Sequence, residues 1–172
     1  MILSTCALPA SQRVFLFDTF AGIPAEALTE AEIAEGLAGG LADTSLGYVK
    51  QRLAKWSSQI TFVEGDVFQT LPEQDTGNLA FVHMDMNAAA PTVRALEYTY
   101  PRMVPGAIMV LDDYGWKGLE AQRTVVDEFF ADKPEAVVVL PTGQGLLIKS
   151  PLDGLVQDRP LQPASAVQGE RP

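Results

Sequence analysis

The chain has 172 residues, of which 47% are hydrophobic and 20% charged. This length suits one ordinary globular domain with a substantial core and is too short for two. The 12 Lys and Arg residues against 22 Asp and Glu give a formal net charge of −10. Because so acidic a surface repels phosphate backbones, we expect no nucleic-acid partner.

Hydrophobic patterning and residue counts limit the location of the protein and the kinds of metal site it can form. No stretch approaches the roughly 20 apolar residues that cross a bilayer, and the short apolar start lacks the basic leader of a signal peptide. We therefore expect a cytoplasmic protein without membrane association. Cys6 and His83 are the single Cys and His, which excludes an internal disulfide, a cysteine zinc site and a site of several His ligands. Carboxylates are plentiful, so a metal held by one chain should be a hard, oxygen-bound ion.

Four short apolar runs each lead into aspartate. They are residues 14–17 before Asp18, 60–63 before Asp66, 79–82 before Asp85, and 107–111 before Asp112 and Asp113. Unbroken runs of this length, rich in β-branched and aromatic residues, predict strands covered on both faces, as in a parallel sheet.

Helical patterns are predicted over residues 29–37, 45–56, 92–100 and 118–130. In the first of them, Glu30, Glu32 and Glu35 should face water. Alternation of strand and helix predicts a doubly wound α/β fold with a mostly parallel sheet. Residues 136–140 and 146–149 flank a short Pro/Gly turn, so the sheet should end in an antiparallel hairpin. Residues 1–150 would form the domain, and the Pro-containing residues 151–172 a disordered tail.

The aspartates that follow the strands should share one edge of the sheet, where ligands bind in such folds. Any single one could merely cap a helix or open a turn. Asp112 and Asp113 are adjacent, so their charges repel, and Asp85 should lie close to them. A cation would relieve that repulsion, and three carboxylates with water could form an octahedral Mg²⁺ site. The alternative is that Asp112 and Asp113 are helix-capping acids.

His83, Asp85 and Asn87 are spaced by two residues and should face one way in a strand. His83 could be a general base or a core histidine bonded to backbone. Cys6 lies in an apolar leader with no evident activating partner, which argues against a nucleophilic role. The sequence contains no G-x-S-x-G elbow, no G-x-G-x-x-G after a strand and no Walker A motif.

Several motifs together resemble the macrocin O-methyltransferase family, which comprises class I S-adenosylmethionine-dependent enzymes that use Mg²⁺ to methylate sugar hydroxyls of natural products. The likeness covers about residues 10–150. Its motifs are residues 17–24 (FDTFAGIP), 64–68 (EGDVF) with 70–72 (TLP), 83–87 (HMDMN), 104–107 (VPGA) and 112–115 (DDYG).

The resemblance implies a Rossmann-like fold with S-adenosylmethionine and Mg²⁺ as cofactors and a small-molecule hydroxyl as acceptor. It implies metal ligation by Asp85, Asp112 and Asp113, with His83 and Asp85 as candidate catalytic residues. Asp18 would bind the ribose hydroxyls, and Asp66 would lie by the adenine. It further implies that Tyr114 and Trp116 wall the acceptor pocket, and that residues 25–44 form a cover.

The chain departs from the family pattern in two respects. The family usually has Asp at the position of Asn87, so the metal shell or the base would differ. The family also begins with a central strand and a glycine-rich loop. We expect the chain to lack both, which would leave a gap between the strands that end at Asp18 and Asp85.

Three functions remain open from the sequence. The first is a Mg²⁺-dependent O-methyltransferase. The second is a non-catalytic, truncated methyltransferase fold that acts through a partner or as a homo-oligomer. The third, a Mg²⁺-dependent hydrolase, would need an Asp-x-Asp strand end, where this chain has Asp85 and Asn87.

Overall fold

The computed structural model describes residues 9 and 11–151. Its strands are β1 (Val14–Asp18), β2 (Ile60–Glu64), β3 (Leu79–Met84), β4 (Met103–Leu111), β5 (Val138–Val139) and β6 (Gly145–Ile148). Its α-helices are α2 (Glu30–Ala34), α3 (Leu46–Arg52), α4 (Val67–Glu73), α5 (Ala89–Thr99) and α6 (Glu120–Phe130). Single 3₁₀ turns are η1 (Ala25–Ala27), η2 (Ala54–Trp56) and η3 (Tyr100–Arg102).

Two sequence predictions concern residues outside this range. Cys6 and the predicted tail beyond residue 151 both lie outside the described residues. Within the described part, no helix is both long and apolar enough to span a membrane.

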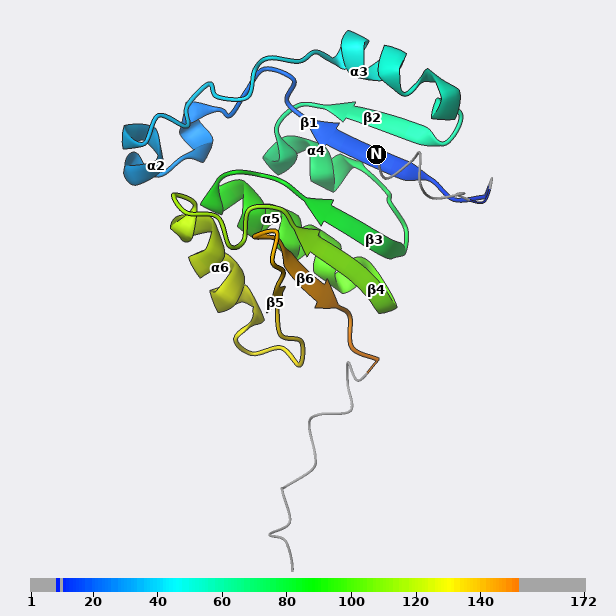
Figure 1. Cartoon of the computed structure of the whole chain (residues 1–172). Coiled ribbons are helices and arrows are strands. Elements are labelled where there is room, and N and C mark those ends of the chain that lie inside the picture. Colours follow the sequence, from blue (N-terminus) through cyan, green and yellow to red (C-terminus); the bar gives the residue numbers. More distant parts are fainter. Residues whose placement is uncertain (1–8, 10, 152–172) are drawn as a thin grey trace, which may run out of the picture.

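The strands form two hydrogen-bonded sheets (Figure 1). β1 pairs in parallel with β2, whereas the second sheet has the order β3-β4-β6-β5. β3 and β4 are parallel, and β6 runs antiparallel to both β4 and β5. The predicted α/β fold with parallel strands and a closing hairpin is therefore confirmed. The division between the sheets falls between β1 and β3, where the resemblance places the family's first strand.

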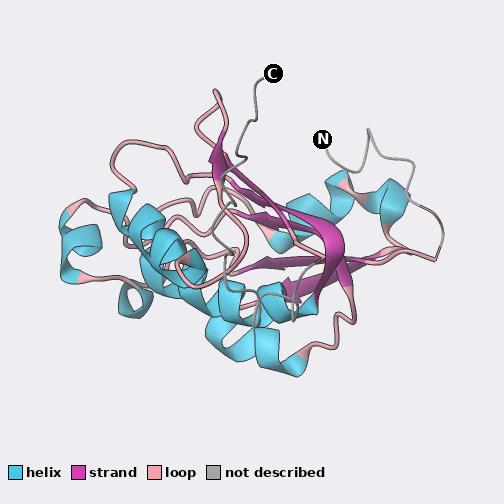
Figure 2. Ribbon diagram, turned by 90° about the horizontal axis from the view of Figure 1, so that it is seen from below, coloured by secondary structure: helices cyan, strands magenta, loops and turns pink. Residues whose placement is uncertain are grey.

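The main core lies on one face of the four-stranded sheet. Helices α4, α5 and α6 pack in sequence against one another, and Figure 2 shows the helices gathered mainly on one side of the strands. Leu96 of α5, Met109 and Leu111 of β4 and Leu147 of β6 are almost completely buried between these layers. Apolar burial of this kind supplies most of the stability of such a layer.

The opposite face of this sheet is open in the described part of the chain. Phe81, Ile108 and Ile148 stand side by side on β3, β4 and β6, and they are 45%, 39% and 57% exposed. The unbroken apolar runs predict strands that are covered on both faces. In the four-stranded sheet, helices cover only one face within the described residues. The reason is that α5 and α6, which follow β3 and β4, both return across the same face.

The helix boundaries differ from the prediction for local reasons. α2 is shorter than expected and is followed by Gly36 at φ +83°, a backbone conformation that α-helices exclude. α5 starts three residues early, because Pro91 is tolerated in a first turn. The sequence analysis did not predict α4, because Pro72 near its end conceals the helical pattern.

The predicted orientation of Glu32 toward water is wrong: the residue is buried.

Candidate active site

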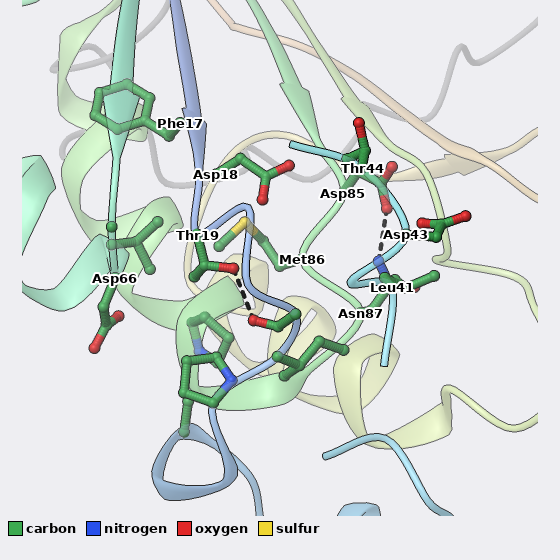
Figure 3. Close-up of a pocket in the computed structure, with 17 residues that line it drawn as sticks. Phe17, Asp18, Thr19, Leu41, Asp43, Thr44, Asp66, Asp85, Met86 and Asn87 are labelled. Atoms are coloured by element: carbon green, nitrogen blue, oxygen red, sulfur yellow. Dashed lines mark hydrogen bonds between the residues drawn. The ribbon is translucent and has the colours of Figure 1, made fainter. Parts of the chain in front are cut away.

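A cavity of about 310 Å³ opens at the carboxyl ends of β1, β2 and β3 (Figure 3). One part of its lining belongs to these strand ends and the turns after them, and the other part to residues 22–44. The strand-end residues are Phe17, Asp18, Thr19, Gly65, Asp66, Val67, Asp85, Met86 and Asn87, with Pro91 of α5. The remaining residues are Gly22, Ile23, Pro24, Ala27, Leu41, Asp43 and Thr44. The edge predicted to bind ligands therefore carries the cavity.

Asp18 and Asp66 both line the cavity, but each is already engaged by nearby backbone. The Oδ1 atom of Asp18 accepts a hydrogen bond from the Phe20 amide at 2.8 Å. Asp66 is the N-cap of α4, where its Oδ1 accepts from the Phe68 amide at 3.0 Å. In Figure 3 the Asp66 carboxylate turns away from those of Asp18 and Asp85. The helix-capping alternative therefore applies to Asp66. Within the described residues, the second oxygen of each side chain remains available for a further donor.

Asp85, Asp112 and Asp113 converge at the ends of β3 and β4. Each offers a carboxylate oxygen, and these oxygens lie within 4.8 Å of one another. Asp85 is exposed and lines the cavity, Asp112 is half-buried, and Asp113 is 8% exposed. Their proximity follows from the parallel pairing of Met84 with Leu111, which brings the two strand ends level. The three predicted metal ligands are thus brought together.

The environment of Asp113 is unfavourable for a negative charge. Burial raises its pKa from 3.8 to about 6, helped by the neighbouring charges of Asp85 and Asp112. Its Oδ2 atom is buried and has no hydrogen-bond partner among the described residues. Within the same range, no Lys or Arg side chain forms an ion pair with this cluster. A set of hard oxygen donors with an unpartnered buried carboxylate oxygen fits a divalent cation such as Mg²⁺.

Polar side chains surround the three carboxylates. His83 Nε2 lies 3.4 Å from Asp112 Oδ1, and both side chains are about one-third exposed. His83 is therefore at the cluster and not in the core, which disfavours the core-histidine alternative. Asn87 adopts a positive φ of 55° and donates from Nδ2 to Asp85 Oδ1 at 2.8 Å. The left-handed conformation, which Asn tolerates well, folds its side chain back toward Asp85.

Two alternatives from the sequence do not match the structure. Asp112 and Asp113 cap no helix, because the next helix, α6, starts at Glu120 with Leu119 as its N-cap. Tyr114 does not wall an open pocket: it is buried, and its hydroxyl bonds the Asp127 carboxylate. Trp116 is exposed and packs beside Gly143. Neither aromatic side chain lines the cavity.

Sequence reasoning missed two polar residues near the site. Gln144, in the β5–β6 turn, donates from Nε2 to Asp112 Oδ1 at 2.6 Å. No sequence signal identifies it, because the contact depends on the hairpin folding back over the end of β4. Glu32 bonds to the start of α5. Its signal was present as Thr29-x-x-Glu32, the pattern of a capping box, which the structure contains.

Comparison with characterised proteins identifies the family of the chain. The model of the macrocin O-methyltransferase (TylF) family matches residues 2–135. The chain is 27% identical over 126 residues to 8-demethyl-8-(2,3-dimethoxy-alpha-L-rhamnosyl)-tetracenomycin-C 4'-O-methyltransferase of Streptomyces olivaceus, covering 69% of this chain and 47% of that protein. It is 31% identical over 89 residues to mycinamicin III 3''-O-methyltransferase of Micromonospora griseorubida, covering 50% of this chain and 34% of that protein. The chain thus spans about half or less of the length of these relatives.

Solved structures show the same fold. The O-methyltransferase NovP superposes with a TM-score of 0.73 at 22% identity, over 81% of this chain and 61% of that chain. The calicheamicin methyltransferase CalS11 superposes with a TM-score of 0.67 at 19% identity, over the same shares. Taken with the family match over most of the sequence, these findings show that the chain belongs to the macrocin O-methyltransferase family.

Proposed function

We propose that this chain transfers a methyl group from S-adenosylmethionine to a hydroxyl group of a small molecule, a sugar or another natural product. Membership of the family and the names of both curated relatives support O-methyl transfer. The observation that carries the proposal is the convergence of Asp85, Asp112 and Asp113 beside a cavity that Asp18 and Asp66 also line.

The proposal includes Mg²⁺ at the three carboxylates. Asp85, Asp112 and Asp113 would hold it, with Gln144 fixing the orientation of Asp112 through its 2.6 Å hydrogen bond. A bound Mg²⁺ supplies Lewis-acid polarisation of an acceptor hydroxyl and lowers its pKa. Asp85 faces both the cluster and the cavity, so it would connect the metal site to the space where substrates bind.

Asp18 and Asp66 are proposed to bind the cofactor. The free oxygen of Asp18, at the end of β1, would accept hydrogen bonds from the ribose hydroxyls. Asp66, at the start of α4, would lie by the adenine. Both side chains are anchored by backbone amides, so they would be held in place before the cofactor binds, which reduces the entropic cost of binding.

His83 is proposed to accept the proton that the acceptor loses. In the transfer, an oxygen–carbon bond forms as the sulfur–carbon bond of the sulfonium breaks, and the hydroxyl proton leaves. His83 lies 3.4 Å from Asp112 and is partly exposed, so it can exchange that proton with solvent. The reaction then depends on alignment of hydroxyl and methyl group and needs no covalent intermediate with the protein.

The test uses the 172-residue chain. Binding of S-adenosylhomocysteine is measured by calorimetry with Mg²⁺ and with a chelator, and thermal unfolding is followed in parallel. We expect binding under both conditions and an additional thermal shift with Mg²⁺, most of which Asp112→Asn removes. Absence of any binding or shift at millimolar ligand would overturn the proposal. A panel of deoxysugar-bearing acceptors with labelled cofactor then tests for methyl transfer.

A second candidate function is favoured by one observation. No described strand pairs with the edge of β1 that faces away from β2, or with the edge of β3 that faces away from β4, and unpaired edges are templates for pairing with another chain. We therefore keep as the alternative a non-catalytic methyltransferase fold that self-associates or binds a partner. Light scattering tests self-association, and a strictly monomeric, well-folded chain would contradict this alternative. A cytoplasmic location remains a prediction.

A further inference from the structure

Glu32 is the buried residue of a helix that is otherwise exposed. α2 has five residues, and Glu32 is the one that is buried, at 4% exposure. Its neighbour Ile33 is 45% exposed. An apolar residue would normally attach so short a helix to the rest of the protein. Here a carboxyl group is in that position.

Both oxygens of the Glu32 carboxyl group accept hydrogen bonds. Oε2 accepts from the backbone amide and the hydroxyl of Thr29, each at 2.8 Å, and so completes the capping box of α2. Oε1 accepts from the backbone amide of Ala89 at 2.8 Å, across 57 positions of sequence. One side chain thus joins the first turn of α2 to the first residue of α5.

The contact with Ala89 provides what α5 lacks locally. Its N-cap is Ala88, which has no side-chain oxygen to bond the free amides of the first turn. The amide of Ala89 is buried in this contact, and a buried amide without a partner is costly. Glu32 therefore acts as a cap for α5 that comes from another part of the chain.

This contact joins the two parts of the cavity lining. Ala27, Leu41, Asp43 and Thr44 line the cavity from residues 25–44, the cover segment. Asn87 and Pro91, on either side of Ala88 and Ala89, line it from the α5 side. At its base the cover segment is held by the Gly39 amide bonding Ile23 O at 2.8 Å and the Ile23 amide bonding Gly40 O at 3.1 Å. Glu32 is its hydrogen-bonded attachment to α5.

We propose that Glu32 is a positioning residue that fixes the cover segment against the N-terminus of α5 and thereby sets the shape of the cavity. Its role in ligand affinity rests on the proposed function, while the attachment itself does not. Glu32 does not line the cavity, so any effect on binding would pass through the cover segment and α5.

The attachment is tested by amide hydrogen exchange on the ligand-free 172-residue chain. In Glu32→Ala we expect exchange of the Ala89 amide and of the α2 amides to accelerate about tenfold or more, since a buried hydrogen bond to a charged group is lost. Glu35 is an exposed acid on the same segment, so Glu35→Ala is the matched control. It should change neither the exchange of the Ala89 amide nor that of the α2 amides. Unchanged protection of Ala89 in Glu32→Ala would overturn the attachment.

Two further variants separate positioning from general destabilisation. Thr29→Val removes the hydroxyl partner but keeps the bond between Glu32 and Ala89, so we expect faster exchange in α2 and unchanged exchange at Ala89. Glu32→Gln retains an amide oxygen as acceptor and should restore part of the protection at Ala89. If Thr29→Val accelerates exchange of the Ala89 amide as strongly as Glu32→Ala does, the proposal that Glu32 caps α5 is contradicted.

The consequence for binding is measured with S-adenosylhomocysteine and, separately, with Mg²⁺ alone. Glu32→Ala should weaken S-adenosylhomocysteine binding at least about tenfold, Glu32→Gln should weaken it less, and Mg²⁺ affinity should remain as in the wild type. Equal losses for both ligands would indicate general unfolding and contradict the positioning role. If the wild type binds no S-adenosylhomocysteine, the proposed function fails, and the exchange data still decide the attachment.

Discussion

Two groups of aspartates occupy the same edge of the molecule and differ in how their charges are compensated. Asp18 and Asp66 are each hydrogen-bonded by the amide two residues further along. Asp85, Asp112 and Asp113 crowd together, and Asp113 has a buried oxygen without a partner among the described residues. The sequence pattern before each aspartate is the same, an apolar strand. β1 and β2 also end level, with Asp18 opposite Glu64, but Asp66 lies two residues further on and caps α4. Asp85 and Asp112 directly follow the paired residues Met84 and Leu111, so their carboxylates meet.

This difference separates two roles. Locally bonded acids stabilise their own turns and can present a fixed acceptor to a neutral ligand group. In the cluster, burial and the neighbouring charges raise the pKa of Asp113, and this electrostatic cost is one that a cation removes. We therefore expect the two groups to respond differently to pH, to Mg²⁺ and to substitution.

The largest expected effect concerns Asp113 in chelator-treated protein. Its pKa is about 6 in the folded state against 3.8 as the ordinary value, so the folded state holds a proton that the unfolded state releases between about pH 4 and pH 6. Wild-type stability should fall as pH rises through this window. Asp113→Asn should therefore stabilise the protein at pH 7 by up to about 3 kcal/mol and by nothing below about pH 4. Urea unfolding across pH measures this.

The next effect is stabilisation by Mg²⁺. A ligand at 100 times its dissociation constant stabilises a folded protein by about 2.7 kcal/mol, and we expect a gain of that order for the wild type in calorimetric melts. Asp112→Asn should remove most of the gain, because one of three carboxylate ligands is lost. Asp18→Asn serves as the control and should retain it. An equal Mg²⁺ shift in both variants would mean that the ion binds elsewhere.

A smaller effect is expected at Asp66. Asp66→Ala removes the N-cap of α4 and should cost about 1 kcal/mol of unfolding free energy, while Asp66→Asn retains a capping oxygen and should cost much less. Neither variant should alter the Mg²⁺ shift. A stability loss in Asp66→Asn equal to that in Asp66→Ala would show that charge, and not the hydrogen bond to Phe68, stabilises this turn.

The smallest effect on stability is expected at Asp18. Asp18→Asn keeps an oxygen that can accept from the Phe20 amide, so urea unfolding should change by less than about 0.5 kcal/mol. S-adenosylhomocysteine affinity should nevertheless fall, because an amide is a weaker acceptor for ribose hydroxyls than a carboxylate. Unchanged affinity in calorimetry would remove Asp18 from the proposed cofactor site.

Much of the fold followed from local patterns. The apolar runs before Asp18 and Asp85 became β1 and β3 within a residue or two, and the Pro/Gly turn correctly predicted the antiparallel β5–β6 hairpin. The helical pattern that begins at residue 45 became α3, with Ser45 as its N-cap. These features depend on residues close in sequence, so the local sequence pattern is sufficient to predict them.

Other features escaped prediction because they depend on contacts across the chain. The helical pattern predicts Glu32 as one of three solvent-facing acids, yet Glu32 is buried, where it caps the start of α5. The family resemblance implies that Tyr114 lines the acceptor pocket. In the structure Tyr114 is buried, and its hydroxyl donates to Asp127 of α6. Neither partner lies near enough in sequence to produce a local signal.

The sequence by itself determined the fold class, the family and the acids at the strand ends. Short motifs indicate the family, and the apolar runs and helical patterns indicate the fold class. Only the tertiary structure decided which acids meet, how strongly each charge is compensated, and that Gln144 and Glu32 belong around the site. The physical reason is that strand register and helix packing set the distances between charges, and electrostatic energy depends on those distances and on burial.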